Sequence, residues 1–437
     1  MEWWIALLFL FGSLLVVLAS GIPVAFGFLL VNILGALLFC GGGIGLEQLI
    51  CSIFSSITTF TMVPVPLFIL MGEVMFESGM GSNMVNSLNK WMGRLPGREA
   101  LLTVGAGGIF SALSGSTIGT TAMLGTTLVP VMERHGYKKP MSLGSVLGSG
   151  GLAMMIPPSA LAVILGGMGN ISIAGLLIGG IGPGVMMAFF YAIYIIVRCT
   201  LQPSIAPSIE ISRISLSEKI IDTVRYVLPL GLIVFLVIGL ILLGVATPSE
   251  AAASGTLGSI ILVALYGRLS WEILKKSFFT TLNISVMVLM IMTATVPFSQ
   301  LLSISGAGVG LVEFTLTLPL TPVAFIIVTQ IVLLFLGMFI GTISMIMITI
   351  PIFMPIIHAL GINPLWFGLL VLINMEMSVT TPPFGINLFA MKGVAPPDTT
   401  MADIYRAGLP FLGCDLVVIA LMIAFPELAL WLPSLMC

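Results

Sequence analysis

The chain has 437 residues, of which 58% are hydrophobic and only 7% are charged. A soluble domain carries roughly 25% charged residues, so the composition excludes a soluble protein, and the long apolar runs predict an all-α polytopic membrane protein with a single integral membrane domain, 1–437. The formal net charge of −2 says little about partners, because in a membrane protein the positions of the charges carry the information.

The first half of the chain alternates apolar segments with short basic loops. Apolar segments are predicted at 4–19, 22–40, 50–79, 101–113, 117–133, 141–168 and 173–197. The loop with Lys90, Arg94 and Arg98 is assigned to the cytoplasm by the positive-inside rule. The paired prolines Pro157-Pro158 interrupt the segment 141–168, which is therefore predicted to be a broken helix.

Two of these segments predict a re-entrant hairpin, 101–134. Each is too short to cross a hydrocarbon core of about 30 Å. After the second segment the chain meets basic residues again, at Arg134, Lys138 and Lys139. The hairpin is therefore expected to enter from the cytoplasm and to turn at Ser114-Gly115-Ser116.

The second half repeats this organisation from the other side of the membrane. A cytoplasmic connector, 199–225, is followed by segments at 226–245, 251–267, 278–302, 323–357, 365–391 and 409–431, the last lying in a C-terminal helix, 409–437. Arg268, Lys275 and Lys276 assign one loop to the cytoplasm, whereas 303–322 has no Lys or Arg and is assigned to the outside. The hairpin 323–357 is thus expected to enter from outside, and Thr381-Pro382-Pro383 breaks the helix 365–391.

The two halves share one spacing of Gly and Pro. Pro130 and Pro355 differ by 225 positions, and so do Pro157 and Pro382. The same offset places Ser116 opposite Gly341, and Ser78-Gly79 resembles Ser305-Gly306 at an offset of 227. Together with the side assignments, this spacing predicts an inverted-topology repeat, the first copy about 50–198 and the second about 278–408.

Hairpin tips and broken helices leave backbone carbonyls without helical partners. A dehydrated Na⁺ prefers such hard oxygen ligands, and the N-termini of half-helices favour an anionic group. Two Na⁺ sites are predicted, one at Ser114, Ser116, Ala153, Ile156 and Pro158, the other at Gly337, Ser378, Thr381 and Phe384. Substrate contacts are predicted at Ser116, Thr117, Ser159, Thr342, Thr380 and Asn387. The alternative is that these small residues pack helices and that the proline pairs only bend them.

Few side chains offer other chemistry. Glu376 lies inside an apolar run, which indicates either a functional carboxylate or one that faces a polar cavity or a neighbouring helix. Glu73 and Glu77 are expected near a membrane edge, facing water or a partner. His135 and His358 both lie at loop boundaries, and a proton relay through them is not expected. Metalloprotease and Walker motifs are missing from the sequence, so the chain is not expected to be an enzyme.

Several motifs resemble the large membrane subunit of the tripartite ATP-independent periplasmic (TRAP) transporters. They are Pro66-Leu67-Phe68-Ile69-Leu70-Met71-Gly72-Glu73, Ser111-Ala112-Leu113-Ser114-Gly115-Ser116, Gly136-Tyr137, Ile156-Pro157-Pro158-Ser159, Ala246-Thr247-Pro248-Ser249-Glu250-Ala251-Ala252 and Thr381-Pro382-Pro383-Phe384-Gly385. The resemblance implies Na⁺ coupling, an elevator-type motion and the same two sets of sodium ligands. It also implies two partners, a small four-helix membrane subunit and a periplasmic substrate-binding protein.

The chain departs from the family pattern at two positions. Many similar proteins have an acidic residue where this chain has Gly341, and many have Gly where it has Ser378. The expected function is Na⁺-coupled secondary active import of a small organic anion, a carboxylate or sulfonate, across the bacterial inner membrane. The alternatives are a proton-coupled carrier of organic anions and a passive channel or facilitator.

Overall fold

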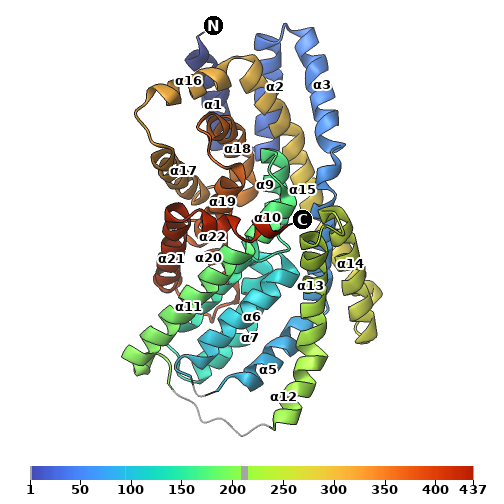
Figure 1. Cartoon of the computed structure of the whole chain (residues 1–437), viewed down its shortest axis with the longest axis vertical. Coiled ribbons are helices and arrows are strands. Elements are labelled where there is room, and N and C mark those ends of the chain that lie inside the picture. The colour runs from blue at the N-terminus through green and yellow to red at the C-terminus, as the bar shows by residue number, and fades with distance from the viewer. Residues whose placement is uncertain (1, 94, 208–214, 437) are drawn as a thin grey trace.

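The computed structural model describes residues 2–93, 95–207 and 215–436, and in these residues the secondary structure is entirely helical (Figure 1). Arg94, Arg213 and Cys437 lie outside the described residues. Seven helical stretches within them are long and apolar enough to cross a membrane. The polytopic all-α architecture is confirmed.

The first half contains α1 (Trp3–Ala19), α2 (Val24–Phe39), α3 (Gly43–Ile57), α4 (Pro64–Glu77), α5 (Met80–Trp91), α6 (Arg98–Ser114), α7 (Thr117–Arg134), α8 (Lys139–Gly151), α9 (Ala160–Gly169), α10 (Ile173–Gly179), α11 (Ile181–Leu201) and α12 (Leu216–Asp222). The second half contains α13 (Leu228–Leu242), α14 (Pro248–Leu265), α15 (Trp271–Ile304), α16 (Ala307–Thr317), α17 (Pro322–Gly337), α18 (Thr342–Ala359), α19 (Pro364–Thr380), α20 (Ile386–Val394), α21 (Met401–Ala424) and α22 (Glu427–Leu430). Short 3-10 turns connect several of them.

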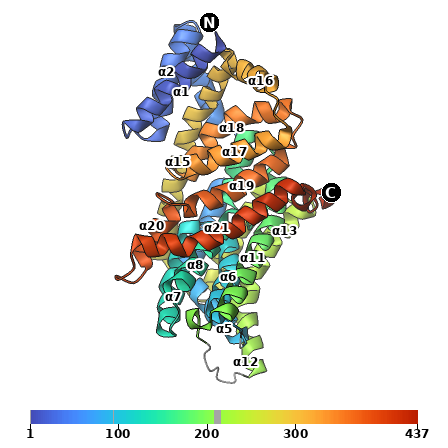
Figure 2. The ribbon, with the colours of Figure 1, turned by 90° about the vertical axis from the view of Figure 1, so that its left-hand side faces the viewer.

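Helices of the two halves correspond in order, and the hairpin helices α7 and α18 also correspond in length. Helix α7 begins at Thr117 and α18 at Thr342, and they end at Arg134 and Ala359, so both ends differ by 225 positions. The pairs α6 and α17, α8 and α19, and α9 and α20 follow the same order. In Figures 1 and 2 the hairpin α6–α7 lies in the lower half of the molecule and α17–α18 in the upper half.

The two repeats pack across one another. Helix α7 of the first hairpin packs against α20, the second half of the second broken helix. Helix α18 of the second hairpin packs against α9, the second half of the first broken helix. Each hairpin is therefore held by a helix of the opposite repeat, and the two helix breaks are drawn to the middle of the molecule (Figure 2).

Two helix bends outside the hairpins also correspond. Helix α4 ends at Glu77, and Gly79 with φ 65° starts α5; α15 ends at Ile304, and Gly306 with φ 74° starts α16. Both glycines adopt the left-handed conformation, which residues with a Cβ atom rarely adopt. The Ser-Gly pairs therefore mark the same junction between two helices in both repeats.

Three sequence-based boundaries were wrong. The segment 50–79 is two helices, α3 and α4, because Pro64 and Pro66 start a new helix after a 3-10 turn, Phe60–Met62. Lys275 and Lys276 lie in the first turns of α15 and not in a loop. The last long helix spans Met401–Ala424 and not 409–437, because Thr400 and Asp403 form a capping box before it and Pro426 follows its end.

Polar contacts join loops that their basic residues assign to the cytoplasm by the positive-inside rule. The Nζ atom of Lys276 lies 2.8 Å from Glu77 Oε2, and Arg268 donates to the carbonyl of Ser78. Lys139 Nζ lies 2.6 Å from Asp398 Oδ2, across the two broken-helix regions. The hydrogen bond from Lys139 holds the pKa of Asp398 below its usual range. These contacts place the loops on one side, as the positive-inside rule predicts.

A smaller core stands apart from the main one. Phe298 of α15 makes edge contacts with Phe11 of α1 and Phe28 of α2, with ring centroids 5.4 and 4.9 Å apart. Leu10 and Leu14 of α1 are also buried in this second cluster. Helices α1 and α2 thus pack against the upper part of α15 (Figure 1).

Candidate functional site

The tip of the first hairpin is held by short side-chain hydrogen bonds. Ser116 caps α7 by accepting from the backbone N–H of Gly119 at 3.1 Å. The Ser114 hydroxyl lies 2.9 Å from Thr120 Oγ1 and accepts from the N–H of Ser116 at 3.3 Å. Gly115, at φ 56°, turns the chain between them. The Ser-Gly-Ser sequence thus builds the tip and directs its hydroxyl groups inward.

The first helix break adjoins this tip. A Cβ atom on Gly115 would lie 3.3 Å from the carbonyl oxygen of Pro158. Within the described residues, no hydrogen bond is directed to the carbonyls of Ala153, Ile156 or Pro158. Unpaired carbonyls in a buried position must be satisfied by another partner. The predicted ligands Ser114, Ser116 and Pro158 therefore belong to one region, and a hard cation is a suitable partner for its oxygen atoms.

The second tip and the second break meet in the same way. Gly337 packs so closely on α19 that a Cβ atom there would lie 2.3 Å from Ser378 Cβ. Phe339 of the tip packs at a tilt against Phe384 of the break, with ring centroids 6.0 Å apart and ring planes 51° apart. The second predicted set therefore also converges from two elements.

The second set has fewer unpaired carbonyls than the first. In the described chain the carbonyls of Gly337 and Phe384 receive no hydrogen bond. Ser378 accepts from Thr381 N at 3.4 Å, and Thr381 accepts from Gly385 N at 3.2 Å. Two of the four predicted ligand positions are therefore engaged with backbone N–H groups in this conformation.

The residues predicted to contact substrate have different positions and hydrogen-bond partners in the structure. Thr117 and Thr342 are the first residues of α7 and α18, so they lie at corresponding half-helix N-termini. Ser159 caps α9 by accepting from Ala162 N at 3.4 Å. Ser116 is the cap of α7, and Thr380 is buried and donates to carbonyls of its own helix.

Asn387 joins elements of both repeats. Its carbonyl oxygen accepts from Thr121 of α7 at 2.6 Å, and its amide donates to the carbonyl of Leu147 in α8 at 3.2 Å. The side chain is fully buried. It therefore braces α20 against the first repeat, a role that the sequence did not indicate.

Gly341 leaves open space at the second tip. It occupies the position before α18 that corresponds to Ser116, and no atom lies within 4 Å of where its Cβ would be. Its φ of −64° is available to any residue. The N-terminus of α18 consequently has no side-chain cap, and the tip carries no charged side chain at this position.

A buried carboxyl pair lies between the two predicted ion sites. Glu376 of α19 is fully buried, and a Cβ atom on Gly151, two residues before Ala153, would lie 1.7 Å from its Oε1 atom. Its carboxyl group lies near that of Asp415 in α21. Asp415 also accepts from the Tyr191 hydroxyl at 2.5 Å.

Sequence analysis found Glu376 but missed Asp415 and Tyr191. Asp415 stands inside the apolar run of the last long helix, which was a usable signal. Neither oxygen of Glu376 receives a hydrogen bond from an N–H or O–H donor in the described residues. The pairing of α19 with α21, which brings the two acids together, is not visible in the sequence.

His135 has an acidic partner, Glu99, from the start of the other helix of the hairpin. Its Nδ1 atom lies 2.5 Å from Glu99 Oε1, and the Glu99 N–H donates to the Tyr137 hydroxyl at 3.3 Å. These contacts close the base of the first hairpin, far along the helices from its tip. Glu77 likewise has a charged partner, because its Oε2 atom lies 2.8 Å from Lys276 Nζ.

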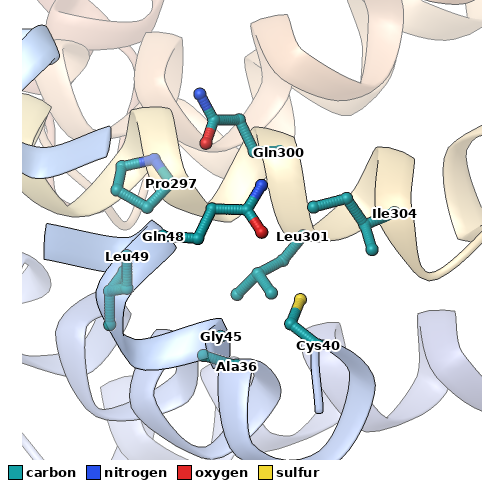
Figure 3. Close-up of a pocket in the computed structure, with 9 residues that line it drawn as sticks. All are labelled: Ala36, Cys40, Gly45, Gln48, Leu49, Pro297, Gln300, Leu301 and Ile304. Carbon is teal, nitrogen blue, oxygen red and sulfur yellow. The ribbon is translucent and has the colours of Figure 1, made fainter. Parts of the chain in front are cut away.

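A small cavity between α2, α3 and α15 is too small for a substrate. Figure 3 shows the Gln48 and Gln300 side chains on opposite elements, with Cys40 at one side. Its volume is about 10 Å³, which is about the space of one water molecule. The tip and break regions remain the candidate site.

Comparison with known proteins agrees with this architecture. A family model described as "Tripartite ATP-independent periplasmic transporter, DctM component" matches residues 11–428. The chain belongs to this family. It is a TRAP transporter permease of the inner membrane and not an enzyme.

Relatives match the TRAP permease over nearly their whole length. It is 30% identical over 444 residues to the C4-dicarboxylate TRAP transporter large permease protein DctM of Rhodobacter capsulatus, covering 98% of this chain and 99% of that protein. It is 28% identical over 440 residues to the sialic acid TRAP transporter large permease protein SiaM of Vibrio cholerae, covering 99% and 97%. The crystal structure of the Alcanivorax borkumensis YdaH transporter has the same fold, with a TM-score of 0.66, 15% identity, and 92% and 91% of the two chains covered.

Proposed function

We propose that this TRAP permease imports a small organic anion by coupling it to Na⁺. The observation that carries the proposal is the meeting of each hairpin tip with a helix break, where carbonyl oxygens lack hydrogen-bond partners. Such oxygens bind a dehydrated Na⁺ without any acidic side chain. The two sets of predicted ligands form two Na⁺ sites, and the half-helix N-termini between them attract the anionic group of the substrate.

The names of the relatives support a substrate with a carboxylate or sulfonate group. Relatives are named as transporters of C4-dicarboxylates, isethionate, ectoine and sialic acid. The substrate is delivered by a periplasmic binding protein. A small four-helix membrane subunit completes the complex. In support, the relative named DctMQ from Oleidesulfovibrio alaskensis is longer than this chain, which covers 65% of it, so the remainder of that protein has room for a second subunit. Transport proceeds by an elevator-type motion of the hairpins and broken helices against the remaining helices.

A sodium gradient should be required for uptake. The complete transporter, reconstituted in vesicles with both partners and saturating binding protein, should accumulate substrate with Na⁺ outside, and not when choline replaces Na⁺. Equal uptake in the two buffers would refute Na⁺ coupling.

Removing single hydroxyl groups should weaken the dependence on Na⁺. Ser116→Ala and Thr381→Ala should each raise the Na⁺ concentration for half-maximal uptake about tenfold, because the loss of one ligand costs about 1.4 kcal/mol. Thr126→Ala is the control, since this exposed threonine donates to the carbonyl four residues earlier, as Thr381 does. Sodium activation that is unchanged in both variants would contradict these sites.

A proton-coupled carrier is the second candidate, and the buried Glu376–Asp415 pair favours it. If protons drive uptake, a pH gradient alone should suffice, and Glu376→Gln should abolish the dependence of uptake on that gradient. The exposed acid Glu313, changed to Gln, is the matched control. If Na⁺ drives uptake, Glu376→Gln should leave the requirement for Na⁺ intact. Uptake by the unchanged protein that does not respond to a pH gradient would eliminate the proton-coupled candidate, and uptake by Glu376→Gln that still follows the gradient would exclude Glu376 as the group that couples it.

A further inference from the structure

A groove of about 530 Å³ opens between α4, α14 and α15, outside the region of the hairpins. Its α15 wall is formed by Trp271, Leu274, Lys275, Phe278 and Phe279. Residues three or four positions apart share one face of a helix. These side chains therefore form a stripe that runs from the first turn of α15 along the groove.

The mouth of the groove lies at the cytoplasmic end of α15. Arg268, three residues before this helix, donates to the Ser78 carbonyl, and Lys276 pairs with Glu77, so both contact the cytoplasmic end of α4. Trp271 is 79% exposed in the first turn. An exposed Trp at a helix end is typical of the membrane–water interface. The deeper wall, with Phe278 and Phe279, lies at the depth of the acyl chains.

Lys275 is the charged side chain of the groove lining, and it has no salt bridge in the described part of the chain. Its neighbour Lys276 is paired with Glu77 at 2.8 Å. Among the described residues, no carboxylate pairs with Lys275, although the side chain lines the groove. The groove therefore combines an apolar hollow with one uncompensated ammonium group at the level of the lipid headgroups.

We propose that this groove binds an anionic phospholipid of the cytoplasmic leaflet. An acyl chain fills the hollow along Leu274 and Phe278, and the phosphate lies against Lys275 beside the Trp271 ring. Anionic headgroups collect at basic side chains on the cytoplasmic face of membrane proteins, and zwitterionic lipids lack the net charge that this site selects. The inference does not depend on which ion drives transport.

The test uses the transporter complex in lipid nanodiscs of phosphatidylcholine with and without phosphatidylglycerol. Phosphatidylglycerol with brominated acyl chains should quench Trp271 fluorescence, measured as the difference between the protein and a Trp271→Phe variant, at least threefold more than brominated phosphatidylcholine does. Lys275→Gln should remove this preference. Lys138→Gln, which changes another exposed cytoplasmic lysine, should keep it.

A second variant separates the acyl chain from the headgroup. Leu274→Trp fills the hollow and leaves Lys275 in place, so phosphatidylglycerol retained through purification, measured by native mass spectrometry, should fall at least threefold. Equal quenching by the two lipids, or Lys275→Gln behaving as Lys138→Gln does, would overturn the proposal. Loss of the small membrane subunit from Lys275→Gln with full lipid retention would also overturn it and would identify the groove as a protein interface.

Discussion

Replacing Gly72 with alanine should reduce substrate uptake at least tenfold. A Cβ atom at this position of α4 would lie 2.2 Å from the carbonyl oxygen and 2.7 Å from the carbonyl carbon of Ser114. Both atoms belong to the backbone of the first tip, so no side chain can move aside. Overpacking of this kind costs roughly 1–3 kcal/mol, and here it displaces the residue that is proposed to hold Na⁺. Initial rates of uptake in vesicles with equal amounts of protein measure the effect.

Gly105→Ala is the matched control for Gly72→Ala. Gly105 lies in α6 of the same hairpin, and nothing is within 4 Å of its ideal Cβ position. This variant should transport as the unchanged protein does, and alanine should favour its helix slightly. Size-exclusion profiles of both variants distinguish a displaced tip from a failure to fold. Normal uptake by folded Gly72→Ala would show that α4 does not determine the position of the tip.

Gly337→Ala should also abolish most uptake, and Ser378→Gly should restore it. The added Cβ atom would lie 2.3 Å from Ser378 Cβ and 2.7 Å from Ser378 Oγ, which forces the second tip away from the second break. Removing the Ser378 side chain clears that space, at a cost of about 1 kcal/mol for glycine inside α19. The double variant should therefore resemble Ser378→Gly alone in its rate of uptake and in its Na⁺ activation.

A double-mutant cycle tests directly whether Gly337 and Ser378 are in contact. Residues that touch show interaction energies of roughly 0.5–3 kcal/mol, whereas distant residues have additive effects. A Gly337→Ala, Ser378→Gly protein as inactive as Gly337→Ala would mean that the clash with Ser378 is not the cause of the loss. Gly393→Ala serves as the control, because that helical glycine has nothing within 4 Å of its ideal Cβ position.

Much of the architecture could be predicted from local signals. Glycine and proline act on the backbone of their own residue, so Gly115 and the two proline pairs mark breaks wherever the chain is placed. The spacing of 225 positions is likewise a property of the sequence alone. Charges near helix ends respond to the membrane and not to neighbouring helices, which is why the loop with Lys139 could be assigned to the cytoplasm before Lys139 was seen to pair with Asp398.

Contacts between distant helices could not be predicted in this way. Glu376 and Asp415 lie on α19 and α21. Glu99 lies at the start of α6, and His135 follows the end of α7. Each pair therefore depends on how two helices pack together. Asn387 was predicted to contact substrate, yet its hydrogen bonds to Thr121 and Leu147 follow only from the packing of α20 on the first repeat. A single sequence offers no signal for such pairs.

The sequence by itself determined a polytopic helical membrane protein with two opposed hairpins, because composition, charge position and Gly-Pro spacing act locally. Only the tertiary structure decided which helix holds which tip: α7 packs on α20 and α18 on α9, so each repeat supports the other. It also decided that Gly72 and Gly337 are contact points and that Gly341 faces open space. The physical reason is that close packing depends on the shapes of both contacting surfaces. The sequence around a residue describes its own surface and does not say which distant residue it packs against.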